Sequence, residues 1–307
     1  MKVYILAMMV VFLLACEENV TELTEDVATQ SVLYYGFNTY SDSAAIYTMN
    51  QDGTNVKDIF RGQKRYPTWY NYPNEILVVS REYNFVTYDL KYSLELFDVN
   101  SDSTDGKILV EDIGNVLFLR YSKIHNSVLF SYRDMYGISR IGYYNLFLNE
   151  MKELPSNSYG AKIPIWSENE DWIYFITQEN STQDIYRVNK EGINYQSFIV
   201  DDEFNLSTFE ISNNSELLVA SRYNENSSFI TIYNLKDKSI LYNIDMSEFG
   251  FALYPSFSAD NNKILFVNGE PNNYSVARNI HIMKLDGTSK EQLTFEENYV
   301  LSRPLNW

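Results

Sequence analysis

The residue types that most often carry out catalysis are scarce in this sequence. There are two histidines, His125 and His281, and no Gly-x-Ser-x-Gly nucleophile elbow, glycine-rich phosphate loop or His-x-x-x-His pair. His125 falls in an apparent turn at residues 123–126, and His281 occupies a slot in an apolar strand pattern. Both are expected to be ordinary turn and strand residues. The sequence therefore predicts no catalytic residue, no metal ligand, no cofactor and no enzymatic activity.

One residue is expected to be chemically modified. Cys16, the only cysteine, follows Lys2 and an apolar run at residues 3–14, which is too short to span a bilayer and typical of a secretory signal. The run ends in Leu-Leu-Ala before Cys16, which resembles the lipobox of bacterial lipoproteins. The resemblance implies cleavage after a signal peptide, residues 1–15, and attachment of fatty acid such as palmitate to Cys16. The alternative is an ordinary signal peptide that contains a cysteine.

The segment that follows, residues 16–31, is polar and acidic. It cannot bury enough apolar surface to fold, so we expect a flexible tether between the lipid and a folded domain. Acidic residues directly after a lipidated cysteine resemble signals that direct lipoproteins to the surface of some Gram-negative bacteria, and a simple solvated spacer is the alternative. The expected location is the bacterial cell envelope, at the outer membrane, on either its periplasmic or its surface side.

The net charge of −17 excludes one class of partner. A protein that binds nucleic acid needs a basic face to displace counterions from phosphates. The strongest basic cluster, Arg61, Lys64 and Arg65, is only three charges in one predicted loop. We therefore expect no nucleic-acid partner, and contact with the membrane only through the lipid.

An internal repeat of about 46 residues organises the chain from Ile46 onward. Each copy combines an Ile-Tyr strand, a polar turn, a Pro-x-Trp segment and a further apolar strand. The Trp position of the repeat is occupied by Trp69, Tyr121, Trp166, Ile211, Phe257 and Trp307. A period of about 40 to 50 residues predicts repeated four-stranded blades. The aromatic content of 16% suits pleated strands, and with only 12 glycines most turns should be shaped by Asn, Asp and Ser side chains.

The sixth copy has no apolar strand after Trp307, and a matching strand occurs at residues 32–37. We expect 32–37, 45–50 and 56–60 to form one blade together with 303–307. Such sharing closes a ring and leaves no strand edge unpaired. The prediction is a single all-β domain over residues 32–307, a monomeric six-bladed β-propeller closed by pairing of N- and C-terminal strands.

Three segments of the repeat carry a family resemblance. They are Asn50-Gln51-Asp52-Gly53, Gln292-Leu293-Thr294 and Pro164-Ile165-Trp166-Ser167. Together they resemble the TolB-type propeller repeat, which reads roughly Ile-Tyr-x-Met-Asn-x-Asp-Gly, Leu-Thr and Pro-x-Trp-Ser-Pro-Asp-Gly. The resemblance implies the six-bladed fold and a protein-binding role in the cell envelope, and it identifies no particular partner.

The predicted connections differ between the two faces of the propeller. Turns between the first and second strands of a blade, and between the third and fourth, share one face and are short. The other connections share the opposite face and are longer; they span residues 81–93, 201–206, 245–252, 268–278 and 296–302. Long loops on a rigid scaffold are the usual place for binding. The candidate binding residues on this long-loop face are Tyr83, Phe85, Arg133, Tyr136, Arg222 and Tyr223, with packing against neighbouring blades as the alternative.

Three functions remain open at this point. The leading one is a non-enzymatic envelope lipoprotein that binds a protein or a glycan through its long-loop face. The second is a metal-dependent propeller hydrolase, lactonase or lyase, which would need several carboxylates converging on the central channel. The third is a structural role with no small ligand.

Overall fold

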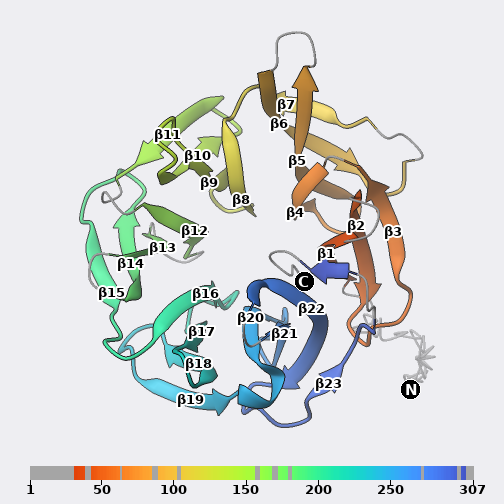
Figure 1. Cartoon of the computed structure of the whole chain (residues 1–307). Helices are drawn as coiled ribbons and strands as arrows, with labels where there is room; N and C mark the ends of the chain where they lie inside the picture. Colours follow the sequence, from red (N-terminus) through yellow and green to blue (C-terminus); the bar gives the residue numbers. More distant parts are fainter. Residues whose placement is uncertain are drawn as a thin grey trace, which may run out of the picture.

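The structure is a computed structural model, and it describes residues 31–301 except 39–42, 63, 85–88, 102–104, 156–159, 168–171, 179–181, 271–272 and 296–298. Six four-stranded antiparallel sheets surround one axis (Figure 1), which confirms the predicted six-bladed all-β propeller. The predicted signal peptide, 1–15, and all but the last residue of the predicted tether, 16–31, lie outside the described residues. No helix in the described part of the chain is long and apolar enough to cross a membrane.

The first three blades follow one another along the chain, each with its innermost strand given first. The first blade contains β24 (Tyr299–Leu301), β1 (Ser31–Asn38), β2 (Ser43–Asn50) and β3 (Lys57–Arg61). The second contains β4 (Lys64–Asn71), β5 (Glu75–Asn84), β6 (Asp89–Asp98) and β7 (Lys107–Val110). The third contains β8 (Asn115–Ser122), β9 (Ser127–Arg133), β10 (Ser139–Asn145) and β11 (Glu150–Leu154).

The last three blades have the same order. The fourth contains β12 (Ala161–Trp166), β13 (Trp172–Gln178), β14 (Gln183–Asn189) and β15 (Gln196–Ile199). The fifth contains β16 (Asn205–Ile211), β17 (Leu217–Tyr223), β18 (Ser228–Asn234) and β19 (Ile240–Asp245), and the 3-10 turn η2 (Ser247–Phe249) follows it. The sixth contains β20 (Phe251–Phe257), β21 (Lys263–Glu270), β22 (Asn273–Lys284) and β23 (Glu291–Gln292).

The two ends of the described chain meet in the first blade. Strand β24 pairs antiparallel with β1, with Gly36 opposite Leu301 and Asn38 opposite Tyr299. Figure 1 shows this strand beside β1 at the centre of the ring. The predicted closure by N- and C-terminal strands is thus confirmed, and the closing pairs form at residues 299–301. The segment predicted to close the ring, 303–307, lies outside the described residues.

The core consists of apolar layers between neighbouring blades. In β1, Val32 and Tyr34 pack against the sixth blade, whereas Leu33 and Tyr35 pack against the second. Successive side chains of a strand point to opposite faces of its sheet, so a blade with neighbours on both sides needs apolar residues at consecutive positions. This is why the strands of the repeat are continuous apolar runs.

The Pro-x-Trp segment marks an irregularity that recurs in the inner strands. Each proline follows a residue in the left-handed region: Tyr66 (φ 54°), Ile163 (φ 52°) and Tyr254 (φ 53°). The pairing register of the inner strand shifts at these points, as expected for a β-bulge. Positive φ is unfavourable for such large residues, so the surrounding blade must hold the backbone in place. The bulge redirects the end of the inner strand, where the Trp position lies.

Asn and Asp side chains shape many of the turns, as predicted. Asp52 Oδ1 accepts a hydrogen bond from the Thr54 backbone N–H at 2.9 Å, and Asp286 Oδ1 accepts the equivalent bond from Thr288 at 3.0 Å. In both turns the aspartate bond spans a glycine at positive φ, Gly53 (79°) or Gly287 (83°), so side chain and glycine shape the turn together.

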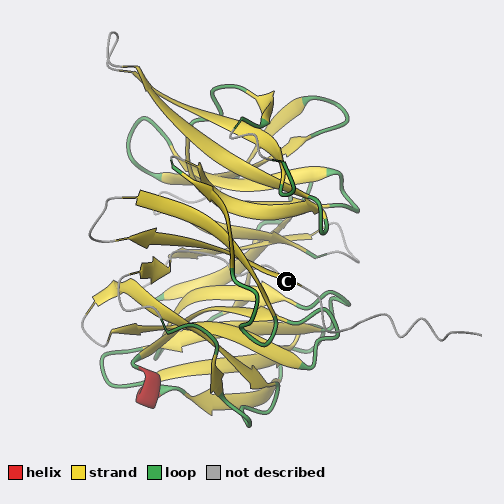
Figure 2. Ribbon diagram, turned by 90° about the vertical axis from the view of Figure 1, so that its right-hand side faces the viewer, coloured by secondary structure: helices red, strands yellow, loops and turns green. Residues whose placement is uncertain are grey.

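Two connections predicted as long loops are largely strand instead. In residues 81–93, β5 and β6 stay paired as far as Asn84 and Asp89, and in 268–278, β21 and β22 pair as far as Glu270 and Asn273. The β5–β6 hairpin projects beyond the body of the propeller (Figure 2). In the first hairpin the apolar run of β5 ends at Val79, and Arg81, Glu82 and Asn84 follow it, which resembles the start of a loop although the backbone pairing continues. The third such segment, 296–302, contains β24.

Both histidines have the packing roles expected from the sequence. His125 lies in the turn after β8 and stacks on Trp166, with ring centroids 4.1 Å apart. His281 is buried on β22 and stacks on Phe266 at 5.1 Å. Burial without a compensating partner lowers the pKa of His281 to about 4.

This pKa predicts an acid-sensitive contribution to stability. An unfolded histidine has a pKa of about 6.5, so between about pH 6.5 and 4 the unfolded state binds more protons and stability falls as pH falls. We expect His281→Tyr, which places the residue found at the equivalent Tyr47 and Tyr186, to reduce this dependence. Thermal melts at several pH values would measure it. Tyr47→Phe should keep the parent's dependence, and an unchanged slope in His281→Tyr would contradict the assignment.

Candidate functional site

The inner strands end around a cavity of about 190 Å³ on the axis of the ring. Five of the six residues at the Trp position of the repeat line it: Trp69, Tyr121, Trp166, Ile211 and Phe257. Because the turn to the second strand follows these residues directly, the cavity belongs to the short-turn face. The repeat position that organises the sequence therefore forms the wall of the channel.

An ion pair crosses this channel. Arg120 on β8 of the third blade pairs with Glu210 on β16 of the fifth blade, across the inner strand of the fourth. The side chains are only 14% and 12% exposed. Both residues also line a smaller hollow, about 10 Å³, formed with Phe118, Thr208 and Tyr254 among others. The pair thus contributes to the walls of both hollows.

The wall of the channel cavity has two unused hydrogen-bond donors. The indole Nε1 atoms of Trp69 and Trp166 are buried, and neither has a hydrogen-bond partner among the described residues. Buried indole N–H groups normally find an acceptor. Beside the Arg120 guanidinium, these donors suit a ligand with acceptor oxygens. The carboxylate of Glu210 is paired with Arg120, and the described residues include no group of three or more His, Cys, Asp or Glu side chains placed to hold a metal ion.

The structure places some of the predicted binding residues at exposed positions on the long-loop face. Tyr83, at the end of β5, is 42% exposed, and Tyr136, in the β9–β10 turn, is 78% exposed. Arg133 is exposed at the end of β9. These three residues belong to the neighbouring second and third blades. Phe85 lies outside the described residues.

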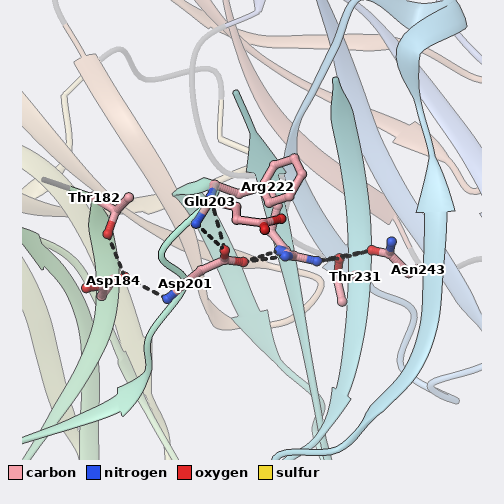
Figure 3. A network of polar contacts seen from close by, with 8 residues as sticks. Thr182, Asp184, Asp201, Glu203, Arg222, Thr231 and Asn243 are labelled. Atoms are coloured by element: carbon pink, nitrogen blue, oxygen red, sulfur yellow. Dashed lines mark hydrogen bonds and ion pairs between the residues drawn. The ribbon is translucent and has the colours of Figure 1, made fainter. Parts of the chain in front are cut away.

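Arg222 belongs instead to a polar network between the fourth and fifth blades (Figure 3). Its Nε donates to Asp201 Oδ2 at 2.7 Å, and its guanidinium lies 4.7 Å from the ring of Phe204. A second nitrogen, Nη1, donates to Thr231 Oγ1 and Asn243 Oδ1, each at 3.3 Å. Arg222 therefore stabilises the contact between two blades, which is the alternative that the sequence left open.

The same network includes a buried carboxylate. The Asp201 backbone N–H donates to Asp184 Oδ1 at 3.1 Å, and Thr182 Oγ1 donates to the same oxygen at 3.4 Å. Burial raises the pKa of Asp184.

Tyr223, the neighbour of Arg222, packs edge-on against Phe251 with ring centroids 5.6 Å apart. The predicted residues therefore fall into two groups, an exposed one on the second and third blades and a packed one on the fifth.

Sequence reasoning missed Arg120 and Glu210, although a signal was present. Both occupy the position just before the Trp position of the repeat. The other four copies of the repeat have Thr68, Ile165, Ser256 and Asn306 there. Opposite charges at an otherwise uncharged repeat position, two blades apart, indicate a pair across the axis.

Comparisons with known proteins establish the fold. No family model and no curated protein matches this chain. Among solved structures, TolB from Acinetobacter baumannii matches with a TM-score of 0.66 and 15% identity, over 90% of this chain and 65% of that one. A putative TolB from Agrobacterium tumefaciens matches with a TM-score of 0.64 and 13% identity, over 87% of this chain and 89% of that one.

A structure from a study of two prolyl endopeptidases also matches, with a TM-score of 0.55 and 12% identity. The match covers 90% of this chain and 43% of that one. This chain therefore spans less than half of that protein and just under two thirds of the Acinetobacter TolB. The TM-scores show that the chain shares a propeller fold with TolB proteins. Sequence identities this low assign no activity.

The Arg120–Glu210 pair makes a testable contribution to stability. Removing one partner of a largely buried pair leaves the other charge unpaired, so Arg120→Met should lower the free energy of unfolding by about 3 kcal/mol. The double variant Arg120→Met/Glu210→Leu should recover much of that loss. The exposed pair Lys290–Glu248 is the control, and Lys290→Met should cost less than about 1 kcal/mol. If urea unfolding gave the same loss of unfolding free energy for Arg120→Met and Lys290→Met, the stabilising role of the Arg120–Glu210 pair would be contradicted.

Proposed function

We propose that this protein is a non-enzymatic lipoprotein of the bacterial cell envelope, whose propeller binds another envelope component through the long-loop face. The observation that supports this most directly is the exposed apolar surface of the second and third blades. Met135 is 88% exposed beside Tyr136, and Tyr83 lies on the adjacent hairpin. Large aromatic and Met side chains are enriched in protein interfaces. A protein is therefore the favoured partner, and a glycan the other candidate.

The tip that presents these side chains is rigid. Asp134 Oδ1 accepts hydrogen bonds from the backbone N–H groups of Tyr136 and Ile138, each at 2.9 Å. Its second oxygen accepts from Arg140 Nε at 2.9 Å. A turn fixed in this way loses little conformational freedom on binding, which favours affinity.

The anchor of the proposed lipoprotein is Cys16, joined to the propeller by the acidic segment 16–31. A net charge of −17 disfavours contact between the propeller and anionic lipid head groups. Attachment through the lipid alone would leave both faces of the propeller accessible to partners. The outer membrane is the proposed location.

A metal-dependent hydrolase, lactonase or lyase is the alternative function. The structural similarity to a prolyl endopeptidase is compatible with an enzyme. Such an enzyme needs converging carboxylates in the channel. In the described channel cavity the carboxylate is that of Glu210, and Arg120 pairs with it. This arrangement favours binding over metal-dependent catalysis.

The binding face can be tested with the intact lipoprotein. Tyr83→Ala/Tyr136→Ala should weaken capture of a partner from native membranes by a factor of about 30, the effect of losing about 2 kcal/mol at a hot spot. The matched control, Asp52→Ala/Asp286→Ala, alters two short turns on the opposite face and should leave capture nearly unchanged. Quantitative mass spectrometry of captured proteins would measure both, and equal losses would show that the face is wrongly assigned.

The proposed lipid anchor at Cys16 predicts how the protein distributes between membrane and soluble fractions. Cys16→Ser removes the only thiol that can be acylated, so the protein should leave the membrane fraction and carry no acyl mass at its N-terminus. Fractionation and intact mass measurement would check this. Unchanged membrane fractionation, with no acyl group on the parent protein, would contradict lipidation.

A further inference from the structure

A second cavity, of about 710 Å³, lies between the fourth and fifth blades on the short-turn face. It shares no lining residue with the channel cavity. Tyr174, Arg187 and Phe198 line it from the fourth blade, and two turns, residues 214–217 and 234–238, line it from the fifth. Its volume is in the range that holds a small organic molecule.

Arg187 provides a cation held between aromatic rings. Its guanidinium carbon is 4.2 Å from the centroid of Trp172 and 5.1 Å from that of Phe198. Nη1 donates to the Tyr174 hydroxyl at 3.4 Å, while Nε is buried and has no hydrogen-bond partner among the described residues. None of the ion pairs between described residues includes Arg187. Among the described residues, this cation therefore has aromatic contacts and no counter-ion.

Two more cations lie at the rim of the cavity. Lys236 and Lys238 are exposed in the β18–β19 turn, and Lys238 Nζ is 4.9 Å from the ring centroid of Phe198. Neither takes part in an ion pair with another described residue. Three cations around one hollow are unusual in a chain with a net charge of −17.

Two described acidic side chains lie near the cavity, each hydrogen-bonded within its own turn, and Asp237 also interacts electrostatically with Lys236. Glu216 lines the cavity but is exposed to solvent, and its Oε2 accepts a hydrogen bond from Asn214 at 2.7 Å. Asp237, in the same turn as the lysines, accepts from the backbone N–H and the hydroxyl of Ser239 at 2.9 and 2.6 Å. A further polar atom in the wall, the Ser215 hydroxyl oxygen, is buried and has no partner among the described residues. Two unused polar groups and three cations thus border the same hollow.

We propose that this cavity binds a small organic anion that carries a carboxylate on a compact polar body. Arg187 and Lys238 would hold the carboxylate, because charge-assisted hydrogen bonds are the strongest polar contacts available there. The rings of Tyr174 and Phe198 would pack against the body of the ligand. This site is on the opposite face from the proposed partner surface, so a ligand and a partner can bind together.

The test uses pairs of probes that differ only in charge. Glucuronate is compared with glucose, and N-acetylalanine with N-acetylalaninamide, by isothermal titration calorimetry on the whole mature chain. We expect at least one acid to bind at least about tenfold more tightly than its neutral counterpart. A preference for glucuronate would identify an acidic sugar as the source of the carboxylate, and a preference for N-acetylalanine would identify a peptide terminus.

Variants then assign the binding to this cavity. Arg187→Met keeps an apolar stem between the two rings and should reduce affinity by at least about tenfold. Lys238→Gln, in an exposed turn that tolerates change, should reduce it as well and serves if Arg187→Met does not fold. Lys57→Gln, an exposed lysine on the first blade, should have no effect. The proposal is overturned if neither acid binds better than its neutral counterpart, or if binding is the same in Lys238→Gln as in the parent.

Discussion

The pairing of β24 with β1 is the contact on which the propeller depends. Each blade buries both faces against its neighbours, so a ring that stays open leaves two blades with an exposed apolar face. Strand β1 illustrates this: Val32 faces the sixth blade and Leu33 the second. The closing strand also supplies hydrogen-bond partners to an edge that would otherwise pair with other chains.

The architecture was predictable because the same sequence pattern recurs in every blade. A period of about 46 residues and continuous apolar strands specify six blades, and the unmatched strand at 32–37 specifies how they close. The hairpin at residues 81–93 was mistaken for a loop because Arg81, Glu82 and Asn84 interrupt the apolar run of β5, whereas the backbone pairing continues to Asn84 and Asp89. The left-handed backbone at Ile163 was also not foreseen, since a β-branched residue before proline normally avoids that conformation.

The candidate sites were less predictable than the fold, because they depend on which side chains meet across blades. Arg222 and Arg187 look alike in sequence, each in an apolar strand. Arg222 meets Asp201 from the connection between the fourth and fifth blades, whereas the described neighbours of Arg187 are aromatic rings and a hydroxyl. One therefore stabilises the ring, and the other is available to a ligand. Exposed tips such as Tyr136 were easier to find, since their exposure follows from a turn on the long-loop face.

Removal of the closing strand tests this account most directly. A chain that lacks residues 299–307 keeps the apolar strands of the repeat but cannot pair β24 with β1. Sedimentation velocity and thermal melting of this chain should show self-association and a melting temperature lowered by about 3 °C or more, the shift expected in a domain of this size from a loss of about 2 kcal/mol. A monomer that melts at the temperature of the parent would contradict the claim that this pairing holds the propeller closed.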